Sequence, residues 1–117
     1  MSDSKVDKEF SRIFKALSNG NRLRVFRLIR AGHEDTETCI NPNRPADIPG
    51  ESVCVCEILE QMDITAPTLS HHLKELRNAG LVDVYNRGQW SYYTVRHDVL
   101  NTLEKFFNEE SLCTSKH

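Results

Sequence analysis

The chain has 117 residues, of which 38% are hydrophobic, four cysteines and a formal net charge of −2 at neutral pH. This length predicts one domain over residues 1–117 with a modest core, which a homodimer would help to cover. No apolar run approaches the ~20 residues of a membrane span, and the N-terminus MSDSKVDKEF lacks the apolar stretch of a signal peptide. We therefore expect a cytoplasmic protein without membrane contact, whose cysteines are thiols.

Charge is distributed unevenly along the chain. Residues 31–63 carry eight acidic residues and one arginine, which leaves a net charge of −7. Residues 64–97 carry four basic and two acidic residues, a net charge of +2, together with three histidines. Because nucleic-acid binding requires positive charge on one face and not over the whole protein, the second stretch is a candidate binding face.

Two helices are predicted at the start of the chain. Apolar residues at helical spacing indicate a helix over residues 6–17, and the SNGN segment that follows can cap a second helix. Residues 22–32 combine an apolar stripe with an arginine-rich flank and end at a glycine. Arg22 and Arg24 near the start of this helix are candidates for DNA phosphate contacts.

The next stretch, residues 33–52, has three prolines, one glycine and few apolar residues. It predicts a long inserted loop, and loops of this length in small domains are usually functional or disordered. At the other end of the chain, the polar residues 111–117 predict a flexible tail.

A short helix is predicted over residues 52–62, SVCVCEILEQM, with Ser52 as its N-cap. Cys54 and Cys56 would then be separated by ~200° around the helix, so their side chains would diverge. Thiolates bind soft ions, but one ion would reach both sulfurs only if the first turn unwound. This geometry predicts a switch in which ion capture distorts the helix.

Another helix, a hairpin and a last helix complete the chain. Thr65 can cap a helix over residues 66–80, residues 81–95 alternate as a β-hairpin with NRGQ at its centre, and residues 97–110 return to helical spacing. The predicted order is α-α-α-α-β-β-α, a mainly helical α+β fold. Helix, short turn, second helix and hairpin in this order are typical of a winged helix-turn-helix.

In that fold the helix over residues 66–80 lies in a DNA major groove, so its outer face needs short polar and cationic side chains. His71 and His72 are adjacent and cannot both face DNA; we expect His71 to point outward and leave His72 open. The predicted DNA-binding residues are Thr68, Ser70, His71, Lys74 and Arg77 on this helix and Arg87 at the hairpin tip.

The chain resembles the ArsR/SmtB family of metal-sensing repressors. The matching pieces are CVC before an apolar helix, the run SHHLKELRNAGLV and the hairpin sequence RGQWSYY, and FKALSNGNRLRVFRLI is similar to the family's opening helices. The resemblance implies a homodimer formed by the first and last helices. It also implies that double-stranded operator DNA is bound without ligand and released with it.

Arsenite-responsive members of the family carry the pattern C-V-C-x-x-C, and the third cysteine of that pattern falls here on Leu59. Because As(III) forms three-thiolate sites, a third ligand must come from elsewhere. We expect Cys39, in the loop just before Cys54 and Cys56, to supply it, with Cys113 as the second choice. The leading hypothesis is a repressor that responds to As(III) or Sb(III).

Other functions are also compatible with the sequence. One alternative is a Cd(II), Pb(II) or Zn(II) sensor of the same family. Cadmium and lead sensors carry further cysteines on an N-terminal arm, however, and no cysteine precedes Cys39 here. It would also be a thiol redox sensor if Cys54 or Cys56 paired with Cys39. A DNA-binding module without effector and a protein-interaction winged helix remain open. An enzyme is not expected, because no catalytic spacing of cysteine, histidine and aspartate stands out. A zinc site on the last helix would use His97, Asp98, Glu109 and Glu110, but the late histidine of such sites is missing.

Overall fold

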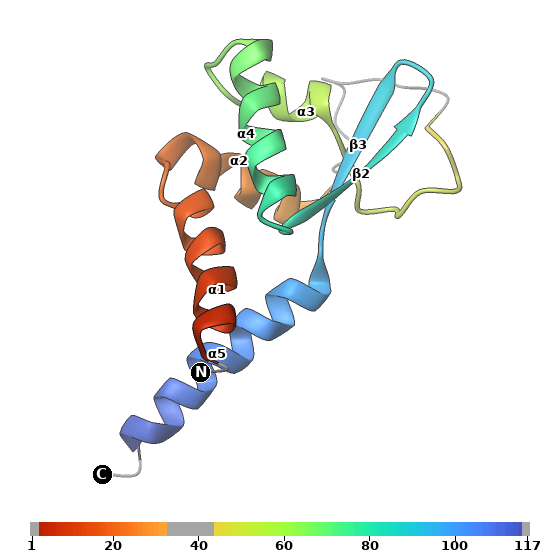
Figure 1. Ribbon diagram of the computed structural model, residues 1–117. Helices are drawn as coiled ribbons and strands as arrows, with labels where there is room; N and C mark the ends of the chain where they lie inside the picture. The colour runs from red at the N-terminus through yellow and green to blue at the C-terminus, as the bar shows by residue number, and fades with distance from the viewer. Residues whose placement is uncertain (1–2, 33–43, 116–117) are drawn as a thin grey trace.

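The computed structural model describes the backbone of residues 3–32 and 44–115 and the side chains of residues 7–32 and 44–108. Its elements follow the order of a winged helix-turn-helix, mostly helical with one small antiparallel sheet (Figure 1). The predicted fold class is confirmed, with one additional short strand. The elements are α1 (Asp3–Leu17), α2 (Gly20–Ala31), β1 (Val53–Cys54), α3 (Val55–Glu60), α4 (Ala66–Asn78), β2 (Val82–Arg87), β3 (Trp90–Val95) and α5 (His97–Ser115).

Local signals in the sequence explain where α2 and α4 begin and end. The Asn19 side chain accepts a hydrogen bond of 3.0 Å from a backbone N–H in the first turn of α2, and Gly32 ends that helix with a φ of 88°. Thr65 caps α4 in the same way, and Pro67 stands in the first turn, where the backbone N–H has no helical partner. Gly80, with a φ of 77°, lets the chain turn from α4 toward β2.

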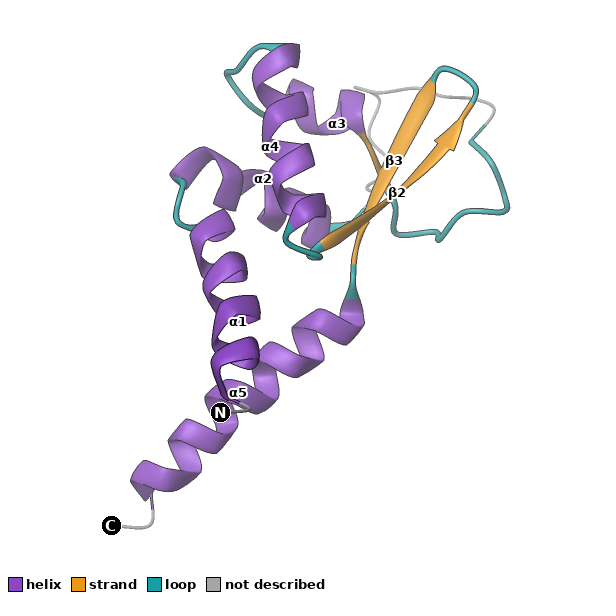
Figure 2. Ribbon diagram, in the orientation of Figure 1, coloured by secondary structure: helices purple, strands orange, loops and turns teal. Residues whose placement is uncertain are grey.

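The sheet has the strand order β1-β3-β2, with both pairs antiparallel (Figure 2). The predicted hairpin is formed by β2 and β3, in which Arg87 pairs with Trp90 across a two-residue turn. Gly88 in this turn has a φ of 61°, a conformation typical of tight hairpin turns. The hairpin is the wing of the fold, and its central strand β3 also pairs with β1.

The helix predicted from Ser52 begins later in the structure. Cys54 is the N-cap of α3, with φ −70° and ψ 144°, and Ser52 is fully buried without a hydrogen bond to its hydroxyl among the described residues. The reason is tertiary, because pairing of Val53 with Tyr93 and of Cys54 with Tyr92 holds this backbone extended. The prediction of an N-cap at Ser52 is therefore wrong.

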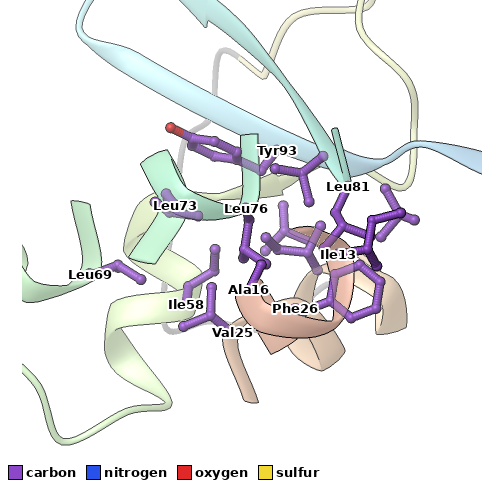
Figure 3. Close-up of a cluster of buried hydrophobic side chains, with 14 residues drawn as sticks. Ile13, Ala16, Val25, Phe26, Ile58, Leu69, Leu73, Leu76, Leu81 and Tyr93 are labelled. Carbon is purple, nitrogen blue, oxygen red and sulfur yellow. The ribbon is translucent and has the colours of Figure 1, made fainter. Parts of the chain in front are cut away.

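One apolar core joins α1, α2, α3 and α4 to the sheet (Figure 3). Burial of each large side chain in such a core contributes about 1.5–3 kcal/mol, so the core fixes α4 on the body of the protein. The residues labelled in Figure 3 are Ile13, Ala16, Val25, Phe26, Ile58, Leu69, Leu73, Leu76, Leu81 and Tyr93. The hydroxyl of Tyr93 is turned away from this cluster (Figure 3).

Helix α5 runs away from the body of the protein and passes alongside α1 (Figure 1). Phe10 and Phe14 of α1 meet Phe106 and Phe107 of α5, and the Phe10 and Phe106 ring centroids are 4.6 Å apart. Phe14 is 40% exposed and Phe107 is 53% exposed, which leaves an apolar face without a cover in the single chain. None of the described helices has the length and apolar character to cross a membrane.

The C-terminal part of α5 differs from the sequence prediction. The helix continues to Ser115, beyond the predicted end at residue 110, and the flexibility of residues 111–117 stays a prediction. No proline or glycine interrupts residues 97–115, and the helical hydrogen-bond pattern therefore continues.

Candidate DNA-binding face and thiol site

Helix α4 has a buried stripe and an exposed polar face. Leu69, Leu73 and Leu76 are at most 2% exposed and face the core. The opposite side is exposed to solvent. The exposed residues on it are Thr68, Ser70, His71, Lys74 and Arg77, the five helical positions predicted to contact DNA.

The two adjacent histidines of α4 have different environments. His71 is exposed, whereas His72 is 5% exposed and its Nδ1 has no hydrogen-bond partner among the described residues. Burial lowers the pKa of His72, and the positive charges of Arg22 and His71 lower it further. His72 is therefore a packing residue of α4.

The arginines at the start of α2 also differ from each other. Arg22 is half-buried, and its Nη1 donates a hydrogen bond of 3.3 Å to the carbonyl of Ala16 near the end of α1. This contact joins α1 to α2, and the predicted contact of Arg22 with a DNA phosphate stays a prediction. Arg24 is exposed, and its contact with a DNA phosphate stays a prediction.

Arg87 lies at the wing tip, as predicted, but it is engaged within the chain. Its Nε donates to Asp47 Oδ2 at 3.0 Å, its Nη2 lies 3.0 Å from the same oxygen, and its Nη1 donates to the carbonyl of Asn86 at 2.8 Å. The hydrogen bond and the charge of Arg87 lower the pKa of Asp47. Because these partners are 40 positions apart, no spacing rule in the sequence indicates the pair.

The sulfurs of Cys54 and Cys56 lie close together. The distance between the two Sγ atoms is 3.0 Å, and Cys54 is 3% exposed. The prediction that the side chains diverge is wrong, because it placed both residues inside a helix. Cys54 is an extended residue of β1, and this directs its side chain toward the first turn of α3.

The chemical states of the two cysteines differ. Cys54 is a free thiol, and burial raises the pKa of that thiol, with the negative charge of buried Glu57 adding to the shift. Cys56 is disulfide-bonded, so the expectation that all four cysteines are thiols is wrong for this residue. Cys39 and the side chain of Cys113, the two predicted third ligands, both lie outside the described part of the chain.

A cavity of about 770 Å³ connects the thiols to the DNA-binding elements. Cys54, Cys56 and Leu59 line it from β1 and α3, so the position where the family pattern has a third cysteine borders the same cavity. A ligand held here would lie against α3, α4 and the wing. Helix α4 contributes Ser70, Leu73, Lys74, Arg77 and Asn78, and the wing contributes Gln89, Trp90, Ser91 and Tyr93.

Residues 44–52 form a segment that we call the strap, which runs from the described end of the inserted loop to β1 (Figure 1). The Nη2 of Arg44 donates to the carbonyl of Ser52 at 2.6 Å and to that of Gly50 at 3.1 Å, and its guanidinium lies 5.2 Å from the centroid of the Tyr92 ring. Ile48 is buried against Cys54 and Tyr92. Residues 33–43 of the predicted loop lie outside the described residues.

The predicted zinc site on the last helix is not assembled in the described part of the chain. His97 is exposed, and Asp98 pairs with Arg96 at 2.9 Å, which lowers the pKa of the carboxyl group. No group of three or more histidine, cysteine or acidic residues is arranged for a metal among the described residues. The side chains of Glu109 and Glu110 are not among them.

The exposed polar face of α4 and the wing beside it define a winged helix-turn-helix DNA-binding protein. The family description "Bacterial regulatory protein, arsR family" matches residues 49–84. The chain is 30% identical over 101 residues to the arsenical resistance operon repressor of Staphylococcus aureus, covering 86% of this chain and 79% of that protein. The chain belongs to the ArsR family of transcriptional repressors.

Two further proteins are similar. The cadmium resistance transcriptional regulatory protein CadC of Listeria innocua is 33% identical over 95 residues, which cover 80% of this chain and 65% of CadC. The solution structure of the homodimeric winged helix-turn-helix DNA-binding domain of Mb0332 from Mycobacterium bovis has a TM-score of 0.63 at 25% identity. That match covers 94% of this chain and 87% of the domain.

Proposed function

We propose that this protein binds operator DNA as a homodimer and releases it when As(III) or Sb(III) binds the thiolates of Cys54 and Cys56 and a third cysteine. The observation that carries the proposal is the 3.0 Å separation of the two sulfurs in a cavity shared with α4 and the wing. The relationship to an arsenical resistance operon repressor supports the same effector class.

The chemistry of the donors fits soft trivalent ions. Thiolates are the ligands that such ions prefer, and two sulfurs already side by side do not require the helix to unwind. The third ligand has only two sources, because the sequence contains four cysteines. A disulfide-bonded Cys56 cannot bind an ion, so the ligand set forms only in the reduced protein, the state that the cytoplasm maintains.

Cys39 remains the first choice for the third ligand, and Cys113 the second. Cys39 is five residues before Arg44, and an extended segment of that length reaches about 17 Å. Arg44 itself lies over the ring of Tyr92, which pairs with Cys54 across the sheet. A ligand from this side would approach the two sulfurs from the strap.

The release of DNA follows from the position of the site. An ion in the cavity would change how α3 packs against α4 and β3, and DNA binding requires these elements in one fixed arrangement. Ion and DNA then oppose each other through linkage. A reversal of occupancy from 99:1 to 1:99 requires a preference of about 5.5 kcal/mol, which thiolate coordination is strong enough to supply.

The operator contacts that we propose are those predicted from the sequence. The exposed face of α4 enters the major groove with Thr68, Ser70, His71, Lys74 and Arg77, and Arg87 at the wing reaches a flanking phosphate or the minor groove. The dimer that we propose forms through α1 and α5. The exposure of Phe14 and Phe107 and the homodimeric state of the Mb0332 domain support this interface. Such a repressor works in the cytoplasm, where its operator lies.

Two observations favour alternative effectors of the same site. The relationship to CadC favours a Cd(II), Pb(II) or Zn(II) sensor. The disulfide at Cys56 favours a thiol redox sensor in which oxidation, and not an ion, releases the operator.

An operator-release assay tests these functions together. The reduced protein, bound to a fragment of its own promoter, is titrated with arsenite, antimonite, Cd(II), Zn(II) and peroxide, for the wild type and for Cys54→Ser, Cys56→Ser, Cys39→Ser and Cys113→Ser. We expect arsenite and antimonite to release DNA, the first three variants to lose the response and Cys113→Ser to keep it.

Each component of the proposal has its own contrary result. Release by Cd(II) but not by arsenite would assign the site to divalent ions. Release by peroxide alone, reversed by a reductant, would establish redox sensing. A normal response in Cys39→Ser together with its loss in Cys113→Ser would exchange the two candidates for the third ligand.

A further inference from the structure

The ion pair between Arg87 and Asp47 joins the wing to the strap. Arg87 stands where a winged helix-turn-helix reaches DNA beside the major groove. Its guanidinium directs both Nε and Nη2 at one carboxylate oxygen of Asp47, each at 3.0 Å. The Asp47 side chain is 67% exposed, so it is at the surface where a phosphate would approach.

The carboxylate is held in place by its neighbours in the strap. Ile48, the next residue, is buried in the cluster with Cys54 and Tyr92. Arg44, three residues earlier, is hydrogen-bonded to strap carbonyls. Asp47 is thus presented to the wing from a segment anchored on both sides, which reduces the conformational entropy lost in making the pair.

A DNA phosphate and the Asp47 carboxylate need the same donors. A guanidinium binds carboxylate and phosphate oxygens with the same planar fork of N–H groups. The fork formed by Nε and Nη2 of Arg87 is directed at Asp47, and Nη1 donates to the carbonyl of Asn86. Contact of Arg87 with a phosphate through this fork therefore requires that Asp47 leave.

We propose that Asp47 competes with DNA for Arg87, so that the strap holds the wing in a charge-neutralised state until phosphate replaces the carboxylate. The inference rests on the proposed contact of Arg87 with DNA. The sequence around Asp47 agrees with this role, because residues 33–52 carry five acidic residues against one arginine.

The expected size of the effect follows from the exposure of the pair. An exposed ion pair shifts an equilibrium by up to about fivefold, and the released carboxylate adds repulsion toward the phosphate backbone. Asp47→Asn should therefore tighten DNA binding about three- to tenfold. The gain should be similar for operator and random duplex, because phosphate contacts carry no sequence information.

The salt dependence provides a second readout. In the wild type, contact of Arg87 with a phosphate releases one counterion from the DNA. At the same time Asp47 loses its partner and attracts a cation, which offsets that release. Without the carboxylate this offset disappears, so the slope of log K against log salt should become steeper by up to about 0.9.

The experiment uses the reduced, metal-free full chain and measures the Kd for promoter and random duplexes by fluorescence anisotropy over a range of salt. The variants are Asp47→Asn, Arg87→Gln and the double variant. The matched control is Glu51→Gln, which removes the same charge from an exposed position of the same strap. Thermal melts confirm that each variant is folded.

We expect Arg87→Gln to weaken DNA binding and Asp47→Asn to tighten it. The control Glu51→Gln should change the Kd less than about twofold. The effect of Asp47→Asn should vanish in the Arg87→Gln background. Equal tightening by Asp47→Asn and Glu51→Gln, or persistence of the effect without Arg87, would overturn the competition. If Arg87→Gln leaves the Kd unchanged, the proposed DNA contact is the part that fails.

Discussion

Replacement of Arg44 by methionine removes the cation that anchors the strap while keeping most of the apolar length of the side chain. In the structure, the Arg44 guanidinium is hydrogen-bonded to the carbonyls of Pro49, Gly50 and Ser52 and lies over the ring of Tyr92. The substitution leaves the core between α2 and α4 untouched. The expected result is therefore local opening of residues 44–52 without global unfolding.

The magnitude follows from the individual contacts. The 2.6 Å hydrogen bond to the carbonyl of Ser52 is half-buried, and a hydrogen bond with a charged donor contributes about 1.5–3 kcal/mol. The contact of the guanidinium with Tyr92 adds about 0.5–1 kcal/mol, and the longer bond to Gly50 is exposed and adds little. We expect the free energy of opening the strap to fall by about 2–4 kcal/mol.

Amide hydrogen exchange at Ser52 measures this change directly, because its N–H donates to the carbonyl of Pro49 at 3.0 Å within the strap. Exchange there should accelerate about 30- to 800-fold in Arg44→Met. The amides of Phe26 and Ile29 in α2 should be unaffected, as should Ser52 in the control Arg27→Met, which changes an exposed residue of α2. Unchanged exchange at Ser52 in Arg44→Met would show that burial of Ile48, and not Arg44, holds the strap.

Three other predictions concern the core and the two buried titratable groups. Leu76→Ala should lower the free energy of unfolding, measured in urea, by about 2–5 kcal/mol because Leu76 is fully buried. The control Leu23→Ala, at a 40% exposed position, should lower it by less than about 1 kcal/mol. Equal losses in the two variants would contradict the assignment of the core. The pKa of His72 is lower in the folded protein than in the unfolded chain, so the unfolded chain binds the proton more tightly. The free energy of unfolding should therefore be at its full value above pH 6.5 and fall below that pH by up to about 1.4 kcal/mol per pH unit. Urea titrations should find this slope reduced in His72→Gln. Burial raises the pKa of the Cys54 thiol, so Cd(II), which must displace the thiol proton, should bind more tightly as the pH rises from about 6 to 8, whereas arsenite, which binds as As(OH)3 and releases water in place of protons, should show little pH dependence. A Cd(II) affinity that does not change with pH would exclude Cys54 as a ligand.

Much of the fold could be predicted because its signals are local. Asn19 and Thr65 cap helices through hydrogen bonds within their own first turns, and Gly32, Gly80 and Gly88 take positive φ values where the sequence indicated ends and turns. The leucines of α4 repeat at helical spacing, so its buried stripe and its exposed polar face were both predictable.

The candidate site was less predictable, because its geometry depends on contacts between distant segments. A two-residue strand such as β1 exists only through its pairing with β3, and no periodicity marks it. The position of Cys54 follows from that pairing. Arg44, Asp47 and Ile48 lie in a segment with the composition of an irregular loop, yet a cation, an anion and a buried side chain there each find a partner in the sheet.

The strand order places Cys54, Tyr92 and Tyr85 in one row across the sheet, because Cys54 pairs with Tyr92 and Tyr92 pairs with Tyr85. Neighbouring strands are about 4.8 Å apart, so the backbone of Cys54 and that of the outer wing strand are separated by only about 10 Å. Strands in register resist sliding, because a shift of one breaks the hydrogen bonds of the next. We therefore expect an ion that displaces Cys54 to shift β3 and β2 together as shear through the sheet, without a flexible hinge.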